Sequence, residues 1–166
     1  ERLGKHGRTF NMFKFRTMLV NAEIMGTGLF SFEHDPRITP IGSILRRYSL
    51  DELPQLLNVI LGTMSIVGPR PPVTYELGCF DDLTSQMKIR FEVNPGITGL
   101  AQISGRNELD WNEKIVFDNK YVSTFSKWGI AYDIVIIART FYAVASGRGV
   151  IELDKKMQTT STKGDN

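Results

Sequence analysis

Cysteine and histidine are scarce in this sequence. Cys79 is its single cysteine, so no disulfide can form within the chain, and we expect it to be a small buried apolar side chain. With only two histidines, His6 and His34, and no pair of cysteines, the usual ligand sets for zinc and other transition metals are missing. A hard cation such as Mg²⁺, held by carboxylates and phosphates, is compatible with what remains.

The sequence also lacks a strong net charge. Its 20 basic and 18 acidic side chains leave +2 at pH 7, which gives no reason to expect a nucleic-acid partner. A hydrophobic fraction of 42% is ordinary for a globular protein, and 166 residues suffice for one domain but are short for two. We therefore expect a single α+β domain over residues 1–151, predominantly helical with a small β-hairpin and short strands. A polar, disordered tail is expected at 152–166.

No apolar run is long and uninterrupted enough to be an obvious membrane-spanning helix. The most apolar stretch, "WGIAYDIVIIARTFYAVASG" at 128–147, is interrupted by Asp133 and Arg139. It fits two alternatives: a helix buried in the core, or an amphipathic helix in the membrane interface. Under the second, Ile136→Glu should weaken vesicle binding while the fold is retained. The chain begins without methionine, so we expect residues upstream of it.

Proline, glycine and capping residues divide the rest of the chain into short elements. Helices are predicted over 40–48, 49–62, 75–91 and 110–125, and strands over 9–18, at the start of "MSIVGPRPPV" and within the loop "NPGITGLAQISGR". Thr39 is the expected N-cap of the first helix, with Pro40 at its first position. Gly62 should end the second helix, and Pro54 lies in its first turn or delays its start.

Three carboxylates have two interpretations each. Asp51 and Glu52 stand side by side in "SLDELPQ", where Ser49 and Glu52 have the spacing of a capping box, an ordinary helix-start signal. The same pair could instead be placed there for chemistry. Asp118 falls inside the apolar stripe of the 110–125 helix, so it is either hydrogen-bonded in the core or faces a site.

Several basic residues occupy rigid or glycine-rich settings. Arg70 in "GPRPP" is framed by prolines that stiffen the backbone, which would suit a guanidinium fork presented to a phosphate. Arg106 closes a glycine-rich loop that lacks the spacing and the Lys-Ser/Thr ending of a Walker motif. Lys14 and Arg16 alternate with phenylalanines and could form one solvated face of a strand. Arg46 suits a helix C-terminus without any further role.

Taken together and in order, three segments closely resemble the bacterial sugar transferases. They are "KFRTM", "DPRITPIGSILRRYSLDELPQLLNVILGTMSIVGPRPP" and "NPGITGLAQISGR", and the resemblance extends over about residues 1–150. These monotopic phosphoglycosyl transferases start capsule, exopolysaccharide and lipopolysaccharide O-antigen glycans. The resemblance implies Mg²⁺-dependent transfer of a sugar-1-phosphate from a nucleoside diphosphate sugar, usually a UDP-sugar, to polyprenyl (undecaprenyl) phosphate. It also implies interfacial amphipathic helices at the cytoplasmic face of the bacterial inner membrane.

The resemblance assigns roles to individual residues as well. Asp51 and Glu52 match the catalytic dyad, with Asp51 the expected nucleophile of a covalent phosphosugar intermediate and both carboxylates the expected Mg²⁺ ligands. The expected substrate- and phosphate-binding residues are Lys14, Arg46, Arg70, Arg106 and Asp118. The main alternative is a catalytically silent membrane-surface scaffold of the same fold, and a second is a soluble nucleotide-binding protein. The sugar, the glycan pathway and the oligomeric state, a homo-oligomer included, stay open.

Overall fold

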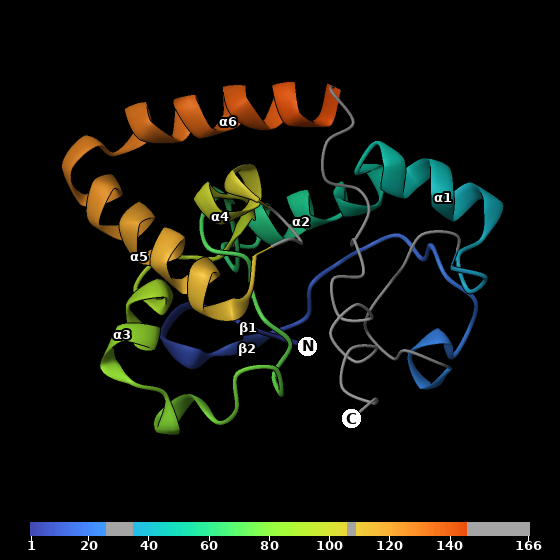
Figure 1. The fold of residues 1–166 in the computed structure, drawn as a ribbon, viewed down its shortest axis with the longest axis horizontal. Coiled ribbons are helices and arrows are strands. Elements are labelled where there is room, and N and C mark those ends of the chain that lie inside the picture. Colours follow the sequence, from blue (N-terminus) through green and yellow to red (C-terminus); the bar gives the residue numbers. More distant parts are fainter. Residues whose placement is uncertain (26–34, 106–108, 146–166) are drawn as a thin grey trace, which may run out of the picture.

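The computed structural model describes residues 1–25, 35–105 and 109–145 (Figure 1). Two expectations, a binding role for Arg106 and a disordered tail at 152–166, lie outside these residues. Within them helices dominate, and the strands are few and short. The predicted α+β class with a helical majority is therefore confirmed.

Six α-helices and four short strands form the described part of the chain. The helices are α1 (Pro40–Arg47), α2 (Gln55–Ile60), α3 (Ser85–Lys88), α4 (Leu100–Ser104), α5 (Trp111–Trp128) and α6 (Ile130–Ala145). Strands β1 (Arg2–Leu3) and β2 (Thr9–Phe10) pair antiparallel, whereas β3 (Ser65–Val67) and β4 (Gly96–Thr98) pair parallel. Two of the 3₁₀ turns, η3 (Leu50–Glu52) and η5 (Ile89–Phe91), carry residues that matter below.

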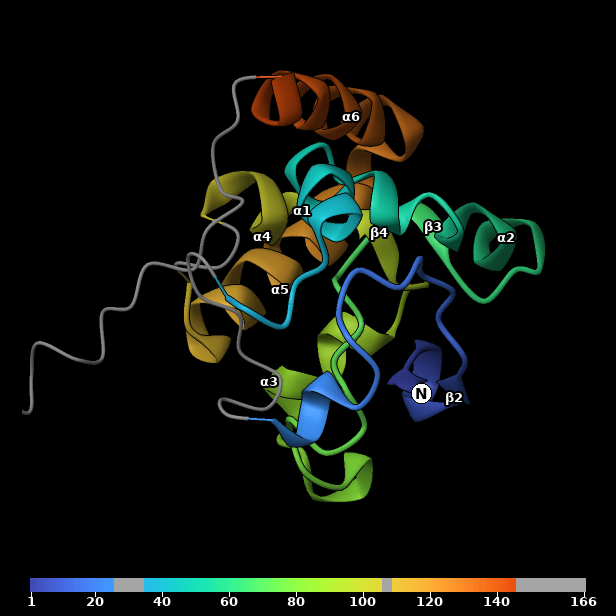
Figure 2. The same ribbon diagram turned by 90° about the vertical axis from the view of Figure 1, so that its right-hand side faces the viewer.

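The main core lies where α5 and α6 pack against β3, β4 and α4. Its fully buried side chains are Val67, Leu100, Tyr121, Val122 and Ile136. Both views show α6 along one side of the molecule, with the β1–β2 hairpin on the other side of this core (Figures 1 and 2). Gly129, with φ of 54°, makes the sharp turn that sends α6 back over α4 and α5.

Helix α5 begins where the sequence predicts. The Asp110 carboxylate accepts a hydrogen bond from the Glu113 N–H at 2.8 Å, and the Glu113 carboxylate accepts one from the Asp110 N–H at 2.9 Å. This reciprocal capping box satisfies two amide groups that the helix cannot pair itself. Ile115 and Val122 lie buried on the inner face, as predicted, and Asp118 lies buried between them.

Helix α6 has one side in the core, as the first alternative predicts, and one side exposed. Ile136 is 1% exposed and belongs to the core, whereas Ile134, Phe141 and Tyr142 on the outer side are exposed. The expectation that Ile136→Glu would keep the fold is therefore wrong, because the substitution would bury an unpaired charge. Among the described residues, no helix is both long enough and apolar enough to cross a bilayer.

Three expectations about the first half of the chain fail. The predicted 75–91 helix is broken, because Gly78 adopts φ of 82° and Thr84 caps a new, short helix. Strand pairing of the 9–18 segment is confined to β2, apart from one bridge at Met18. Cys79 is exposed rather than buried.

The glycine-rich loop contains the predicted strand, β4, but also helix α4, which the sequence reading missed.

Glycines allow β3 and β4 to meet without side chains between them. A Cβ atom on Gly96 would collide with the main chain at Gly68, and one on Gly99 would collide with the Gly68 carbonyl. The close approach fixes where β3 ends, immediately before the proline-rich segment that carries Arg70. The glycines therefore position a candidate site residue through the backbone.

Candidate active site

The Asp51-Glu52 pair lies on a 3₁₀ turn, not at a capped helix start. Ser49 adopts the left-handed conformation with φ of 55° and makes no capping hydrogen bond, so the predicted capping box is wrong. The positive φ of a serine is a local strain that separates α1 from η3. Regular helix resumes only at Gln55, which confirms the alternative that Pro54 delays the start of α2.

Asp51 is buried but in contact with a cation. Its carboxylate is 2.7 Å from the ammonium of Lys14, and the residue is 3% exposed. The main chain supports this pair, because the Phe15 N–H donates to the Asp51 carbonyl at 3.0 Å. The ammonium therefore forms a close ion pair with a carboxylate that has little contact with water.

Asn58 on α2 fixes the segment that brings in Lys14. Its side-chain oxygen accepts from the Phe13 N–H at 2.9 Å, and its amide group donates to the Asn11 carbonyl at 2.8 Å. One buried side chain thus takes the place of a neighbouring strand for residues 11–13. The sequence reading missed Asn58, although a polar residue inside the apolar stretch "QLLNVI" was a visible signal.

The Glu52 carboxylate contacts a second cationic side chain, that of Arg70. Both Nη atoms of Arg70 lie 3.2 Å from one Glu52 oxygen, and this carboxylate raises the pKa of Arg70. The Lys14 ammonium is 4.0 Å from the same oxygen. The side chain of Arg70 is 45% exposed, in contrast to Asp51, so the cluster opens to solvent on its arginine side.

The structure brings four of the expected site residues together: Lys14, Asp51, Glu52 and Arg70. Arg46 donates a hydrogen bond from Nε to the Thr17 hydroxyl at 3.0 Å.

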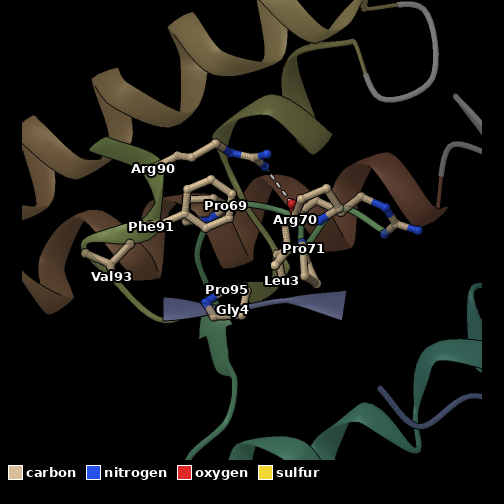
Figure 3. A pocket seen from close by; sticks show the side chains of 10 residues that line it. Leu3, Gly4, Pro69, Arg70, Pro71, Arg90, Phe91, Val93 and Pro95 are labelled. Atoms are coloured by element: carbon tan, nitrogen blue, oxygen red, sulfur yellow. Dashed lines mark hydrogen bonds between the residues drawn. The ribbon is translucent and has the colours of Figure 1, made fainter. Parts of the chain in front are cut away.

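Asp118 reaches the site indirectly, through a residue that the sequence reading missed. Its carboxylate is 2.9 Å from Nη2 of Arg90, and the same Nη2 donates to the main-chain carbonyl of Arg70 at 2.6 Å (Figure 3). Asp118 therefore lies behind the Arg70 segment, in the core. The signal for Arg90 was a basic residue flanked by apolar ones in "KIRFEV".

The donor set of the pair fits a magnesium ion completed by substrate. Among the described residues, no group of three or more histidine, cysteine or acidic side chains could hold a metal ion. Mg²⁺, however, is commonly bound by one or two carboxylates together with substrate phosphates. Asp51 and Glu52 supply two adjacent carboxylates, each already in contact with a cationic side chain. The same oxygens are therefore suited to a cation.

The arrangement has the parts that phosphoryl transfer needs. A carboxylate kept ionised can act as a nucleophile. A partly exposed guanidinium can bind phosphate oxygens in a two-pronged fashion and stabilise charge that develops on them. The described residues thus combine Asp51, a candidate nucleophile, with Arg70, a candidate phosphate ligand that contacts the neighbouring Glu52.

Comparison with known proteins identifies the family of this chain. The sequence profile of the family described as "Bacterial sugar transferase" matches residues 1–147. The chain belongs to this family. It is 43% identical to the exopolysaccharide production protein ExoY of Sinorhizobium fredii, with 89% of this chain and 69% of that protein covered.

Longer relatives match over the same region. The chain is 40% identical to the undecaprenyl-phosphate galactose phosphotransferase of Salmonella typhimurium, with 84% of this chain and 31% of that protein covered. It is 41% identical to the UDP-glucose:undecaprenyl-phosphate glucose-1-phosphate transferase of Escherichia coli, with 85% and 31% covered. The chain thus spans about a third of the length of these two relatives.

Asp118 should make stability depend on pH between its unfolded and folded pKa values. Burial raises the pKa of Asp118 from 3.8 to about 6, although Arg90 opposes the shift. The folded chain therefore binds more protons than the unfolded chain in this window, and its free energy of unfolding falls as pH rises. The free energy of unfolding of the wild type, minus that of Asp118→Asn, should therefore fall by on the order of 2 kcal/mol between about pH 4 and pH 6.

Urea unfolding at a series of pH values measures this difference, since groups that titrate alike in both proteins cancel. Above about pH 6.5 the difference should be level. A difference that is constant or rises from pH 4 to pH 6 would show that the Asp118 carboxyl does not have a raised pKa.

Proposed function

We propose that this protein transfers a sugar-1-phosphate from a UDP-sugar to a polyprenyl phosphate, the step that starts a bacterial surface glycan. The observation that carries the proposal is the Asp51-Glu52 pair held between Lys14 and Arg70. The relatives support the chemistry, since two of them are named for transfer to undecaprenyl phosphate. The motifs of the site concern phosphate and cation, so the proposal leaves the sugar unspecified.

Asp51 is the proposed nucleophile. One oxygen of its carboxylate attacks the phosphorus that carries the sugar, and the bond from that phosphorus to UMP breaks with its electron pair leaving on UMP. An acyl phosphate on Asp51 then holds the sugar-1-phosphate. An oxygen of the polyprenyl phosphate attacks the same phosphorus and releases the Asp51 carboxylate unchanged.

The neighbouring residues orient Asp51, bind the donor phosphates and provide Mg²⁺ ligands in the proposed reaction. Lys14 orients the Asp51 carboxylate through a 2.7 Å ion pair while the carboxylate is largely shielded from water. Arg70 exchanges its contact with Glu52 for the phosphate oxygens of the donor, where a guanidinium fork is effective. Asp51 and Glu52 would hold Mg²⁺, which when bound supplies positive charge to the diphosphate and to the departing UMP.

The protein is proposed to act on a membrane surface, at the cytoplasmic face of the inner membrane, because its acceptor is a lipid. Exposed apolar side chains on α6 recur with helical spacing at Ile130, Ile134 and Phe141. Helix α2, which directly follows the dyad, exposes a second set: Leu56, Leu57 and Ile60. Such faces suit helices that lie in the membrane interface without spanning it.

A catalytically silent scaffold of the same fold is the alternative. In favour of it, both carboxylates are already compensated by cations of the same chain, which is also how structural ion pairs look. Release of UMP from a donor distinguishes the two functions.

The covalent step predicts a burst. Full-length protein given UDP-sugar and Mg²⁺ without polyprenyl phosphate should release at most one equivalent of UMP, because the acyl phosphate has no acceptor. A sugar-phosphate adduct should map by mass spectrometry to the peptide that contains Asp51. Asp51→Asn should abolish both signals, since a neutral amide is a poor nucleophile, and Glu52→Gln should slow the burst without moving the adduct.

Two outcomes would contradict this assignment. An adduct on Glu52 would reverse the roles of the two carboxylates. A protein that turns over normally with both substrates but shows no burst would indicate direct attack by the lipid phosphate.

The membrane proposal predicts that the outer face of α6 contributes to lipid binding. Phe141 is 73% exposed, so Phe141→Glu should leave the core intact. We expect it to weaken binding to anionic vesicles in a co-sedimentation assay by about 10- to 100-fold, because about 1.5–3 kcal/mol of apolar burial in lipid is lost. Val116→Glu is the matched control, since it adds the same charge at a similarly exposed apolar position of α5. Equal binding by wild type and Phe141→Glu would exclude this face.

A further inference from the structure

The segment that carries Arg70 is held almost entirely through its carbonyl groups. Three of its four residues, 69–72, are prolines and have no N–H to donate. Its carbonyl oxygens accept hydrogen bonds from elsewhere: Pro69 from the Gly96 N–H at 3.0 Å, Arg70 from Nη2 of Arg90 at 2.6 Å, Pro71 from Nη1 of Arg2 at 3.5 Å, and Pro72 from the Leu3 N–H at 3.0 Å. Arg90 makes the bond at the residue that faces the dyad.

A buried, charged Arg90 is not needed if its contact with the Arg70 carbonyl only stabilises the fold. Its side chain and that of Asp118 are both 1% exposed, and the rings of Phe91 and Trp111 lie about 5 Å from its guanidinium. Burying such a pair removes hydration from two charges, and apolar residues of similar volume often give equal or greater stability. Stability alone therefore does not account for a buried Arg90-Asp118 pair aimed at one carbonyl.

The geometry connects this pair to the direction of the Arg70 side chain. In Figure 3 the Arg90 guanidinium meets the main-chain oxygen of Arg70, while the side chain of Arg70 leaves the segment in another direction. That side chain ends in the two 3.2 Å contacts to Glu52. A rotation of the Arg70 peptide would move the guanidinium away from the dyad, and a misplacement of 1 Å can cost roughly 100-fold in rate.

We propose that Arg90 is a positioning residue for the transfer reaction: held by Asp118, it fixes the main-chain carbonyl of Arg70 and so sets where the Arg70 guanidinium meets the donor phosphate. This inference rests on the proposed function, in which Arg70 binds that phosphate. It assigns Asp118 an action through Arg90 and the backbone, without contact with substrate.

A variant that replaces the pair by apolar residues tests the proposal. Arg90→Met with Asp118→Leu keeps the buried volume and should preserve the fold, but it removes the hydrogen bond to Arg70. We expect kcat for UMP release by the full-length protein to fall about 30-fold, with a smaller change in KM. Val122→Ala, which opens a cavity in the same helix without changing a bond to Arg70, is the control and should keep near-normal kcat.

A double-mutant cycle shows whether Arg90 acts through Arg70. In an Arg70→Ala background the apolar replacement should lower kcat by less than about twofold, because the side chain to be positioned is gone. The same fold-loss in both backgrounds, or a folded apolar variant with wild-type kcat, would overturn the proposal. If the apolar variant does not fold, Arg90→Lys enters the same cycle with the same expectations.

A readout that does not depend on activity separates this proposal from the proposed function. A crystal structure of the apolar variant should show Arg70 displaced from Glu52, and unchanged 3.2 Å contacts would overturn the positioning role. Wild-type protein that releases no UMP from any donor would instead overturn the proposed function. An additive cycle in an active enzyme would contradict only the role of Arg90.

Discussion

The contact between the Lys14 ammonium and the Asp51 carboxylate is the interaction on which the rest of the site depends. A carboxylate that is 3% exposed has lost most of its contact with water, so a charge or hydrogen bonds must replace that contact. Lys14 provides that charge at 2.7 Å, but it belongs to a segment without strand partners of its own. The buried Asn58 side chain and the Asp51 carbonyl therefore provide the hydrogen bonds that a neighbouring strand would otherwise give this segment.

On the Arg70 side of the site, the position of the side chain is set by a rigid backbone. Glycines at Gly68, Gly96 and Gly99 let two strands approach closely, and a proline-rich segment then leaves the sheet with little freedom. Arg70 is presented from this segment to Glu52, while its own carbonyl is held from the core by Arg90. The buried Asp51 carboxylate, the proposed nucleophile, thus lies near an exposed guanidinium, and in the proposed reaction a phosphate replaces Glu52 as the partner of that guanidinium.

The sequence predicts what local signals determine. Thr39 with Pro40 marks a helix start correctly, because the capping hydrogen bond, from the Gly42 N–H to the Thr39 hydroxyl, joins residues only three positions apart. Residues brought together from distant segments, such as Lys14 with Asp51, were found only through resemblance to a family. Asn58 and Arg90 stand out as polar residues among apolar ones, but their roles were missed because the main-chain groups that they bind carry no signature in the sequence. Ser49 was misread because its left-handed conformation overrides a good capping pattern.

The most direct test of the account is a structure of the full-length protein with Mg²⁺ and a donor analogue that cannot be cleaved. If Asp51 is the nucleophile, the sugar-bearing phosphorus should lie about 3–3.5 Å from an oxygen of its carboxylate, which is the distance of a group poised for attack. Arg70 should then have left Glu52 for the diphosphate. A donor bound elsewhere, with Arg70 still on Glu52 and Lys14 still closing Asp51, would contradict the account.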